Sequence, residues 1–363
     1  PDIPLNVSRS YLQSDSNVKK ISSHISKKVA DRLEEIFKEN RKEFESKWDD
    51  LKLFINYGML SDEKFYERAE NFALFKDTNG DYYTFEEYKK LIKENQTDKN
   101  KTLIYLYATD KEQQHSYIQK ANEKGYNVLL MDGQLDPHFI NQLEQKLSDS
   151  RFTRVDADVI DKLIEKEDSK DSGIDAEERL EMNTVFQSQV PEKEKYTVSF
   201  EAMGENESPV IITQSEFLRR MKDMSKMSGA DPFYGSMPET FNLVVNTDHR
   251  LFKKVLEEKN KKLSKKLDEI KTKLDPLHEE KEKINKKNEK KKDDEIEQAD
   301  KDKLENLDKQ IDSIRSEKNK ELEKFAGKNK LVKQLIDLAL LSNNMLKGEA
   351  LTSFVNRSID LIK

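Results

Sequence analysis

Hydrophobic residues recur at helical spacing through the first hundred residues. The apolar positions between Asn17 and about Phe44 step by three or four residues, with Lys and Glu filling the other positions, which predicts an amphipathic helix. They are Val18, Ile21, Ile25, Val29, Leu33, Ile36 and Phe37. A second apolar cluster runs from Trp48 to Tyr57. We expect Gly58 to break this cluster and Ser61 to cap the next helix.

The same region predicts one turn and one more helix. Thr78-Asn-Gly-Asp81 is a turn signal. Thr84-Phe-Glu-Glu87 has the order of a helix start, with a hydroxyl residue three positions before a Glu. We therefore assign residues 17–98 to one helical segment.

Strand-like runs alternate with helices between Thr102 and Asp156. The strands are expected at 102–107, 127–131 and 151–155, and the helices at 111–124 and 137–147. This order predicts a parallel sheet with right-handed crossovers, as a small βαβαβ three-layer subdomain over 99–164. No Gly-x-Gly-x-x-Gly or Walker pattern follows a strand. We expect a structural layer here rather than a nucleotide site.

A third pattern begins after a charged linker and a short helix at 165–190. Strands are expected at 196–202, 209–213 and 241–246, with the first two joined as a hairpin through Gly204-Glu-Asn-Glu-Ser. Residues 191–363 are assigned to an α+β C-terminal domain. The predicted fold class is mixed α+β and α/β, and rich in helix.

A methionine-rich helix lies inside this last region. Phe217, Met221 and Met224 share one helical face, Leu218 flanks it, and Met227, Phe233 and Tyr234 follow. A stripe of this kind is usually core. Methionine side chains are also flexible and polarisable, which suits a surface that binds varied apolar partners.

The stretch 257–327 is dominated by charge. Of the 23 residues from Lys281 to Lys303, 17 are charged. Apolar positions nevertheless keep a regular spacing on both sides of 281–303. They step by four and three residues before it and by three and four residues after it, which is typical of coiled-coil seams. They are Leu263, Leu267, Ile270, Leu274 and Leu277, then Leu304, Leu307, Ile311 and Ile314.

We predict that this stretch is an inserted antiparallel helical hairpin with a kink or restart at Asp275-Pro276. Pairing between two subunits and a disordered charged loop are the alternatives.

Two apolar helices end the chain. Their broad faces either pack on the preceding domain or pair with the same helices of a second copy as a four-helix bundle. The residues expected at such a dimer interface are Leu335, Leu338, Leu341, Leu351, Phe354, Val355 and Ile359.

Composition narrows the function classes. The chain has 363 residues, 38% charged and 34% hydrophobic, with a net charge of −7 and no cysteine. Two or three domains are expected at this length. The acidic balance argues against nucleic acid as a partner, and no apolar run is long enough to cross a membrane. His24, His115, His138, His249 and His278 show no metal-ligand spacing, so no metal site is predicted.

The N-terminal stretch 1–16 carries a candidate anion-binding pair. If a helix follows Ser8, Arg9 and Gln13 are four residues apart on one face of it. A guanidinium beside an amide suits a phosphate group. The alternative is an Arg and a Gln on an ordinary surface.

Several motifs, in this order, resemble the heat-shock protein 90 chaperone family, and in particular its bacterial HtpG type. The resemblance rests on Ile3-Pro-Leu-Asn-Val-Ser-Arg9, Leu12-Gln13, Phe54-Ile-Asn-Tyr-Gly-Met59, Lys124-Gly-Tyr-Asn-Val-Leu-Leu130, Asp132 to Asp136, Val244-Val-Asn-Thr-Asp-His249, Leu338-Ala-Leu-Leu341 and Phe354-Val-Asn-Arg357. It covers nearly the whole chain except the charged hairpin. The family usually has Glu where this chain has Ser10.

The resemblance implies a function and roles for residues. Residues 1–16 would be the remnant of a catalytic loop whose Arg9 and Gln13 contact the phosphate of ATP held, with Mg, by a separate N-terminal domain. We expect that domain to be absent, so that this fragment by itself binds no cofactor and is no enzyme.

The resemblance also implies a cytoplasmic homodimer, acting in protein folding and the stress response. It would bind partly unfolded client proteins through the methionine-rich helix.

Two other functions remain open at the sequence level. The chain could be a non-enzymatic coiled-coil scaffold, in which the heptads matter and Arg9 has no role. It could also be an α/β enzyme acting through the 102–156 sheet, although that function lacks a catalytic group.

Overall fold

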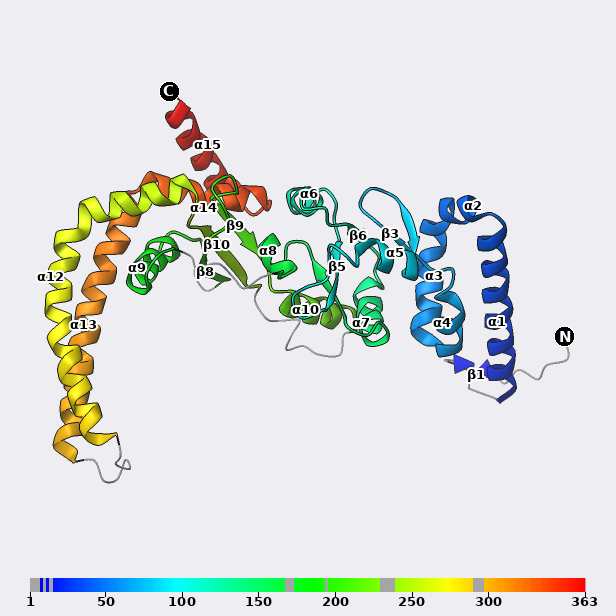
Figure 1. The fold of residues 1–363 in the computed structure, drawn as a ribbon, viewed down its shortest axis with the longest axis horizontal. Helices are drawn as coiled ribbons and strands as arrows, with labels where there is room; N and C mark the ends of the chain where they lie inside the picture. Colours follow the sequence, from blue (N-terminus) through cyan, green and yellow to red (C-terminus); the bar gives the residue numbers. More distant parts are fainter. Residues whose placement is uncertain are drawn as a thin grey trace. The chain divides into compact units, whose positions relative to one another are not determined.

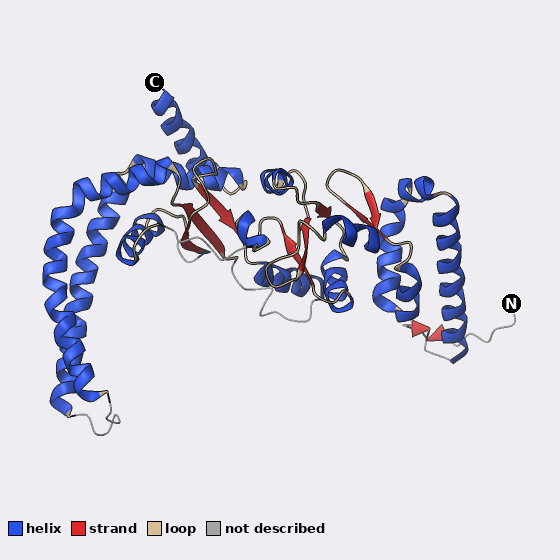
Figure 2. Cartoon of the chain, in the orientation of Figure 1, coloured by secondary structure: helices blue, strands red, loops and turns tan. Residues whose placement is uncertain are grey.

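The computed structural model describes residues 7–8, 11–12, 16–166, 173–192, 195–228, 239–289 and 297–362. In this part of the chain helices dominate, and the strands form four small sheets (Figure 2). The chain divides into two compact units (Figure 1). Unit 1 takes the described residues of 1–167 and 216–237, and unit 2 takes those of 168–215 and 238–363. Among the described residues, no helix is both long and apolar enough to span a membrane.

Unit 1 begins with two short strands and a group of helices. The elements up to the first long strand are β1 (Val7–Ser8), β2 (Tyr11–Leu12), α1 (Ser16–Glu39), α2 (Arg41–Ser46), α3 (Trp48–Ser61), α4 (Glu63–Ala69), β3 (Leu74–Lys76), β4 (Tyr82–Thr84) and α5 (Phe85–Ile92). β1 and β2 pair antiparallel. Tyr11–Leu12 is therefore strand and not part of a helix that follows Ser8.

Three sequence expectations in these helices are corrected. The helix expected over 17–44 is interrupted at Asn40, whose side chain accepts a hydrogen bond from the Glu43 amide and starts α2. Ser61 is the last residue of α3 rather than a cap, and Asp62 caps α4 instead. Gly58 does not break α3. A Cβ at Gly58 would lie 2.7 Å from the Phe65 ring, so glycine is needed there for close packing.

The expected start of α5 is present. Thr84 and Glu87 form a reciprocal capping box, each side chain bonding the other's backbone amide. The turn at Thr78-Asn-Gly-Asp81 joins β3 to β4, where Gly80 has a φ of +96°.

The rest of unit 1 is a layered sheet. Its elements are β5 (Leu103–Ala108), α6 (His115–Glu123), β6 (Val128–Leu130), α7 (Asp136–Lys146), β7 (Ser150–Arg154), α8 (Ile160–Leu163) and α10 (Glu216–Ser228). The strand order is β6-β5-β7, and both pairings are parallel. All six residues of β5 are buried, because helices cover both faces of the sheet.

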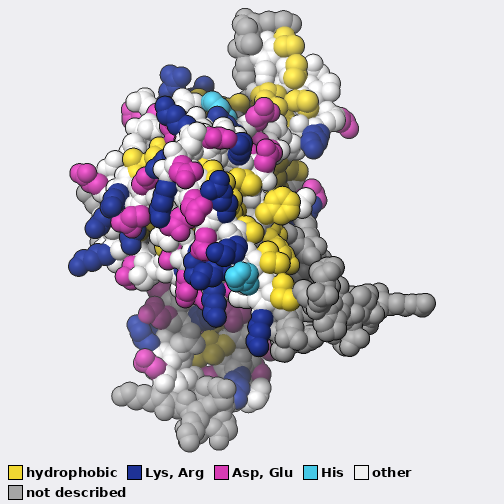
Figure 3. Space-filling model, turned by 90° about the vertical axis from the view of Figure 1, so that its right-hand side faces the viewer, with side chains coloured by type: hydrophobic (Ala, Val, Ile, Leu, Met, Phe, Trp, Pro, Cys, Tyr) yellow, Lys and Arg dark blue, Asp and Glu magenta, His cyan; other side chains and the backbone are white. Residues whose placement is uncertain are grey.

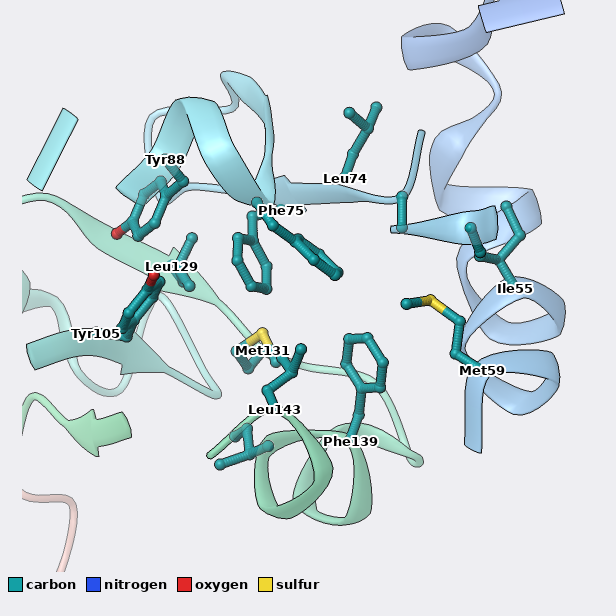
Figure 4. Packing of buried hydrophobic residues seen from close by; sticks show 14 of the residues in the cluster. Ile55, Met59, Leu74, Phe75, Tyr88, Tyr105, Leu129, Met131, Phe139 and Leu143 are labelled. Carbon is teal, nitrogen blue, oxygen red and sulfur yellow. The ribbon is translucent and has the colours of Figure 1, made fainter. Parts of the chain in front are cut away.

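Successive residues of β5 join two different hydrophobic cores. Leu103, Tyr105 and Tyr107 face a core shared with the helices α1 to α5 and α7. Ile104, Leu106 and Ala108 face a smaller core under α6 and α8. The first core joins buried residues from Ala30 to Phe152 in one cluster, and Figure 4 shows part of it. The expected boundary between 17–98 and 99–164 is therefore not a break in the packing.

Unit 2 combines a three-stranded sheet with long helices. Its elements are α9 (Ala176–Gln187), β8 (Tyr196–Glu201), β9 (Val210–Thr213), β10 (Phe241–Asn246), α12 (Arg250–Asn288), α13 (Gln298–Lys328), α14 (Lys330–Ser342) and α15 (Gly348–Ile362). β10 lies in the middle, parallel to β8 and antiparallel to β9.

The hairpin expected between the first two strands of unit 2 is wrong, because β8 and β9 do not pair. β10 is the central strand, and its Leu243, Val244 and Val245 are at most 2% exposed. The Asn246 side chain, just after these residues, donates to the Gly204 carbonyl and so holds the β8–β9 connection at the end of the sheet.

α12 and α13 lie side by side within one chain as an antiparallel hairpin (Figure 1). Ion pairs follow the antiparallel direction: Lys266–Glu321 at 2.7 Å, Lys303–Glu280 at 2.6 Å and Lys287–Asp300 at 2.9 Å. α12 is continuous through Pro276, so the helix restart that we considered at Asp275-Pro276 is wrong. Buried side chains on both sides of the proline, Ile270 and Ile284, hold α12 against α13 and offset the lost backbone hydrogen bond.

Candidate functional site

The site residues predicted from sequence fall into three groups in the structure. Arg9 and Gln13 lie outside the described residues, so the proposed phosphate contact has no geometry to examine. The same holds for Phe233 and Tyr234 of the predicted client-binding set. Met224 and Met227 lie within α10, but only the backbone is described there. Phe217, Leu218 and Met221 are described in full.

Over 216–222, where its side chains are described, helix α10 is oriented opposite to an ordinary amphipathic surface helix. Phe217 is 66% exposed and Leu218 is 40% exposed, whereas Arg219 is only 8% exposed. Met221 is half-buried. The helix thus turns charged side chains toward unit 1 and leaves apolar side chains in solvent, although burial normally favours the reverse. We had assigned 191–363 to one C-terminal domain, but α10 packs on α7 in unit 1.

Glu216 is the centre of the polar contact that holds α10 in place. Its Oε1 accepts hydrogen bonds from the Tyr107 hydroxyl at 2.5 Å, from Arg219 Nη2 at 2.9 Å and from Arg220 Nε at 2.6 Å. Its Oε2 accepts from the Arg154 backbone amide at 3.2 Å. Burial raises the pKa of Glu216, but the charges of Arg219 and Arg220 outweigh burial, so the pKa lies below its ordinary value. Glu216 is therefore ionised at neutral pH.

Arg220 extends this contact to α7 and to β7. Its Nη1 donates to Glu144 Oε2 at 2.7 Å, and its Nη2 donates to Glu144 Oε1 at 3.1 Å and to the Phe152 carbonyl at 2.5 Å. Such a bidentate ion pair fixes the orientation of the guanidinium as well as its position. Burial lowers the pKa of Arg220, but hydrogen bonding to Glu144 and the charge of Glu216 raise it overall.

Arg219 completes the polar face of α10. Its guanidinium lies over the Tyr107 ring, 5.8 Å from the centroid, and its Nη2 donates to the Tyr107 hydroxyl at 2.5 Å. Burial and the charge of Glu216 raise the pKa of Tyr107, which keeps the hydroxyl neutral and able to donate. Sequence reasoning identified the apolar face of α10 and missed this polar face. The pattern Glu216-x-x-Arg219-Arg220 was the available signal.

The predicted dimer residues divide between core and surface within unit 2. Leu335 is 2% exposed and Phe354 is 8% exposed, and both belong to the core of their own unit. The two residues are covered within their own unit, because α14 packs on α9, α12, α13 and β9, and α15 packs on α14. Leu351 is half-buried against the same core.

Four residues of the same set remain accessible. Leu338 is 42% and Leu341 is 37% exposed on α14, and Val355 is 46% and Ile359 is 47% exposed on α15. An ion pair between Arg357 and Asp337 joins the two helices. The two helices therefore carry an apolar surface that their own unit leaves uncovered.

The face of the molecule seen in Figure 3 is mixed in charge. Figure 3 shows Lys and Arg side chains interspersed with Asp and Glu, beside a strip of apolar atoms. Among the described residues no group of three or more His, Asp or Glu side chains could hold a metal ion.

Comparisons with known proteins agree on one family. The Hsp90 protein family matches residues 1–274. A protein of Bacteroides fragilis called chaperone protein htpG is 58% identical over 364 positions, covering 100% of this chain and 54% of that protein. A chaperone protein HtpG of Porphyromonas gingivalis is 50% identical, covering 100% of this chain and 53% of its own length. The chain thus spans about half the length of these curated relatives.

The comparisons differ over the α12–α13 hairpin. The family match ends at residue 274, before most of the hairpin. The relatives from Bacteroides and Porphyromonas align over the whole chain, hairpin included. A more distant chaperone protein HtpG, from Bdellovibrio bacteriovorus, is 26% identical and covers 70% of the chain.

Proposed function

The chain belongs to the Hsp90 family, and from this premise we propose that it holds partly unfolded client proteins on the exposed face of α10, as part of an ATP-dependent chaperone. The orientation of α10 is the observation that carries the proposal. Phe217 and Leu218 are exposed while Glu216, Arg219 and Arg220 are engaged with unit 1. A charged anchor leaves the apolar side chains free to contact a partner.

An apolar client segment gains from such a surface without needing a fixed sequence. Covering the exposed apolar area of Phe217 and Leu218 releases water and stabilises the complex by roughly 25 cal/mol per Å². Glu216, Arg219 and Arg220, which hold α10 on unit 1, do not take part in that contact. The helix can therefore bind a client without losing its position on unit 1.

The test compares two surface substitutions. The double variant Phe217→Glu, Leu218→Glu should lose protection of chemically unfolded citrate synthase against aggregation, measured by light scattering. We expect about a fivefold rise in the chaperone concentration needed for half-protection, equivalent to about 1 kcal/mol. The control is Leu180→Glu, because Leu180 is 71% exposed on α9, in unit 2. Equal protection by both variants would exclude α10 as the client surface.

The proposal includes ATP turnover, because residues 1–16 resemble the catalytic loop of the family. We propose that Arg9 and Gln13 contact the phosphate of ATP in a protein as long as these relatives. Another part of that protein would bind the ATP together with Mg. In such a protein Arg9→Ala should lower ATP turnover on the order of 100-fold, because a cation that stabilises developing phosphate charge is lost. Arg32→Ala, at an exposed ion pair on α1, is the control. Unchanged turnover in Arg9→Ala would remove Arg9 from the mechanism.

We also propose that two copies associate through α14 and α15. The accessible residues Leu338, Leu341, Val355 and Ile359 support this, since an uncovered apolar surface on two adjacent helices suits a twofold bundle. A cytoplasmic location is part of the same proposal. A scaffold whose heptads pair between copies is not favoured, because α12 and α13 pair within one chain.

A further inference from the structure

Unit 1 contains a pocket at the end of its parallel sheet where β5 and β7 begin. The volume of the pocket is about 300 Å³, at the lower end of the range of about 300 to 1,000 Å³ that is typical of ligand pockets. Its walls come from α5, from the turn before β5, from the first residues of β5 and β7, and from the segment that joins α7 to β7. It shares no residue with the contact that holds α10 on unit 1. The pocket is therefore a separate site with room for a small organic molecule.

The lining of this pocket carries an excess of positive charge. Among the described residues that line it, Lys89, Lys93 and Lys101 are basic and Asp149 is acidic. Lys89 lies in the last turn of α5, and Lys93 is the residue at the C-terminal end of that helix. Residues four apart share a helix face, with Cβ atoms about 6 Å apart. Two of the three ammonium groups therefore project from one face of α5, and the lining as a whole has two positive charges in excess.

Neighbouring lysines that do not line the pocket are paired with carboxylates. Lys90 Nζ lies 3.3 Å from Glu86 Oε1, and Lys99 Nζ lies 3.1 Å from Glu165 Oε2. Within the described part of the chain, the three lysines of the lining have no ion pair of this kind. A ligand with negative charge would therefore not have to displace a carboxylate from them.

One wall of the pocket is apolar. It is formed by Leu103 and Tyr105 of β5 and by Leu147. Tyr105 is only 1% exposed. Its ring stacks on the Phe152 ring with the centroids 4.6 Å apart, and it lies beside Tyr88, as Figure 4 shows. This packing fixes the Tyr105 side chain, so the wall offers a preformed surface to the apolar part of a ligand.

The Tyr105 hydroxyl is a hydrogen-bond donor without a partner among the described residues. Its oxygen is not one of the fully enclosed polar atoms that lack a partner, so it is accessible from the pocket. Burial raises the pKa of Tyr105, and the negative charge of Glu86 on α5 adds to the rise, so the hydroxyl keeps its proton. Because Glu86 acts on it, the hydroxyl lies on the side of the ring nearest α5, the helix that carries Lys89. A ligand oxygen bound near Lys89 can therefore accept from it.

Two turns at the pocket hold residues other than glycine in the left-handed region. Lys101 has a φ of +68° and Asp149 a φ of +57°. The Asp98 carboxylate accepts from the Asn100 and Thr102 amides at 2.9 and 2.8 Å, and the Leu103 amide donates to the Asp149 carbonyl at 2.8 Å. Such conformations persist only where the surrounding structure holds them. Lys101 is therefore presented from a fixed turn.

We infer that this pocket binds a small organic phosphate, a monoester whose phosphate lies among Lys89, Lys93 and Lys101 and accepts from the Tyr105 hydroxyl. Its apolar body covers Leu103 and Leu147. A phosphate monoester carries about −1.5 to −2 charges at pH 7, which matches the two positive charges in excess. Lysine binds phosphate as a point charge without a demand for fixed geometry. The same group occurs on free small molecules and on phosphotyrosine side chains.

Phenyl phosphate is the probe for this site. Titrated against the whole chain at low salt, where screening is weak, it should give a saturable change in its phosphorus resonance, with a dissociation constant between about 0.1 and 10 mM for so small a ligand. Benzyl alcohol has the ring without the charge, and inorganic phosphate has the charge without the ring. Each should compete at least about fivefold more weakly than phenyl phosphate itself. Benzyl alcohol of equal potency would refute the role of the lysines, and inorganic phosphate of equal potency would refute the role of the apolar wall.

Matched variants locate the binding. The double variant Lys89→Gln, Lys93→Gln should weaken binding of phenyl phosphate at least about tenfold. Lys42→Gln with Lys64→Gln is the control, since both residues are exposed in unit 1, do not line the pocket, and change the net charge equally. All four positions are exposed, so both proteins should fold. Equal affinity of the two double variants, or no saturable binding by the unsubstituted chain, would overturn the inference.

Tyr105→Phe tests the hydroxyl by itself. The substitution keeps the ring and removes no hydrogen bond within the described part of the chain, so the protein should fold. Binding of phenyl phosphate should weaken about three- to tenfold, because one hydrogen bond to a charged group is lost. Unchanged affinity would exclude the hydroxyl from the site.

The source of the phosphate is decided by competition. A blocked pentapeptide with one central phosphotyrosine is titrated against bound phenyl phosphate. Displacement at concentrations similar to those of phenyl phosphate identifies a phosphorylated peptide as the ligand. Failure of the peptide, with phenyl phosphate still saturable, identifies a free small molecule.

Discussion

Arg220 on α10 and Glu144 on α7 form a two-pronged ion pair, with Nη1 to Oε2 at 2.7 Å and Nη2 to Oε1 at 3.1 Å. The two residues are 76 positions apart in sequence. The pair is largely buried, with side chains 13% and 24% exposed. It fixes the polar face of α10 on unit 1 and so determines that Phe217 and Leu218 remain in solvent.

Removing Arg220 should release α10 from unit 1. Arg220→Ala leaves Glu144 and the Phe152 carbonyl without their guanidinium partner, and breaking a buried pair typically costs about 3 to 5 kcal/mol. Hydrogen exchange of the backbone amides in 216–222 should accelerate by two orders of magnitude or more, about 3 kcal/mol. Arg32→Ala is the control, because the Arg32–Glu35 ion pair is exposed on both sides and surface pairs contribute little to stability. Unchanged protection of 216–222 would show that α10 is held by other contacts.

Two glycines in helices should respond oppositely to alanine. Gly58→Ala should destabilise unit 1 by about 1 to 3 kcal/mol, because the new methyl group would lie within 3 Å of the Phe65 ring. Gly327→Ala, in α13, meets no atom within 4 Å and should stabilise the chain by about 0.5 to 1 kcal/mol. Urea denaturation of the two variants measures both effects. A stable Gly58→Ala would mean that Phe65 can move aside.

The Arg41–Glu87 pair predicts a pH dependence of stability. Hydrogen bonding from Arg41 lowers the pKa of Glu87 to about 2. An unfolded Glu titrates near about 4.3. Because the folded pKa is the lower one, the stabilisation is complete above the unfolded pKa and is lost as pH falls from about 4 to about 2.

Glu87→Gln measures that contribution, since glutamine preserves the capping box with Thr84 but not the charge. The Glu87 side chain is 42% exposed, so solvent screening limits the difference in free energy of unfolding to about 0.5 to 1 kcal/mol at pH 7. The difference should shrink toward zero on titration to pH values near the folded pKa. A difference that stays constant with pH would argue that the pair contributes through packing alone.

A buried ion pair at the base of the α12–α13 hairpin predicts that removing one partner costs more stability than removing the other. Lys259 Nζ on α12 lies 2.5 Å from Glu181 Oε2 on α9, and Lys318 of α13 lies 2.7 Å from Glu181 Oε1. Lys259→Met should cost little, because Glu181 keeps Lys318. Glu181→Leu should cost about 3 to 5 kcal/mol, because Lys259, with a side chain 2% exposed, is left as a buried charge.

The double variant Glu181→Leu, Lys259→Met is the control for this asymmetry. It should recover much of the loss, measured by thermal unfolding of the whole chain. A double variant as unstable as Glu181→Leu would mean that shape, rather than the unpaired charge, determines the cost.

The proposed association of two copies predicts a change in mass. Leu338→Asp with Ile359→Asp places charge on the accessible surface of α14 and α15 and should yield monomers by light scattering. Leu180→Asp, at an exposed site on α9, should leave the mass unchanged. A persistent dimer in the first variant would place the interface elsewhere.

The sequence alone determined the local elements and the family. Periodic apolar positions identified the helices, the hairpin seams and the strands of the parallel sheet, because these depend on spacing along the chain. The capping box at Thr84 could be predicted for the same reason. The motif order resembled the Hsp90 family, and the comparisons show that membership.

Only the tertiary structure decided which surfaces are covered. It placed β10 between β8 and β9, continued α12 through Pro276, and buried Leu335 and Phe354 while leaving Leu338 and Ile359 exposed. It also turned the charged face of α10 inward, toward groups as distant in sequence as Tyr107. Spacing shows which residues share a face, but burial depends on partners far away in the chain. That information is absent from any single stretch of sequence.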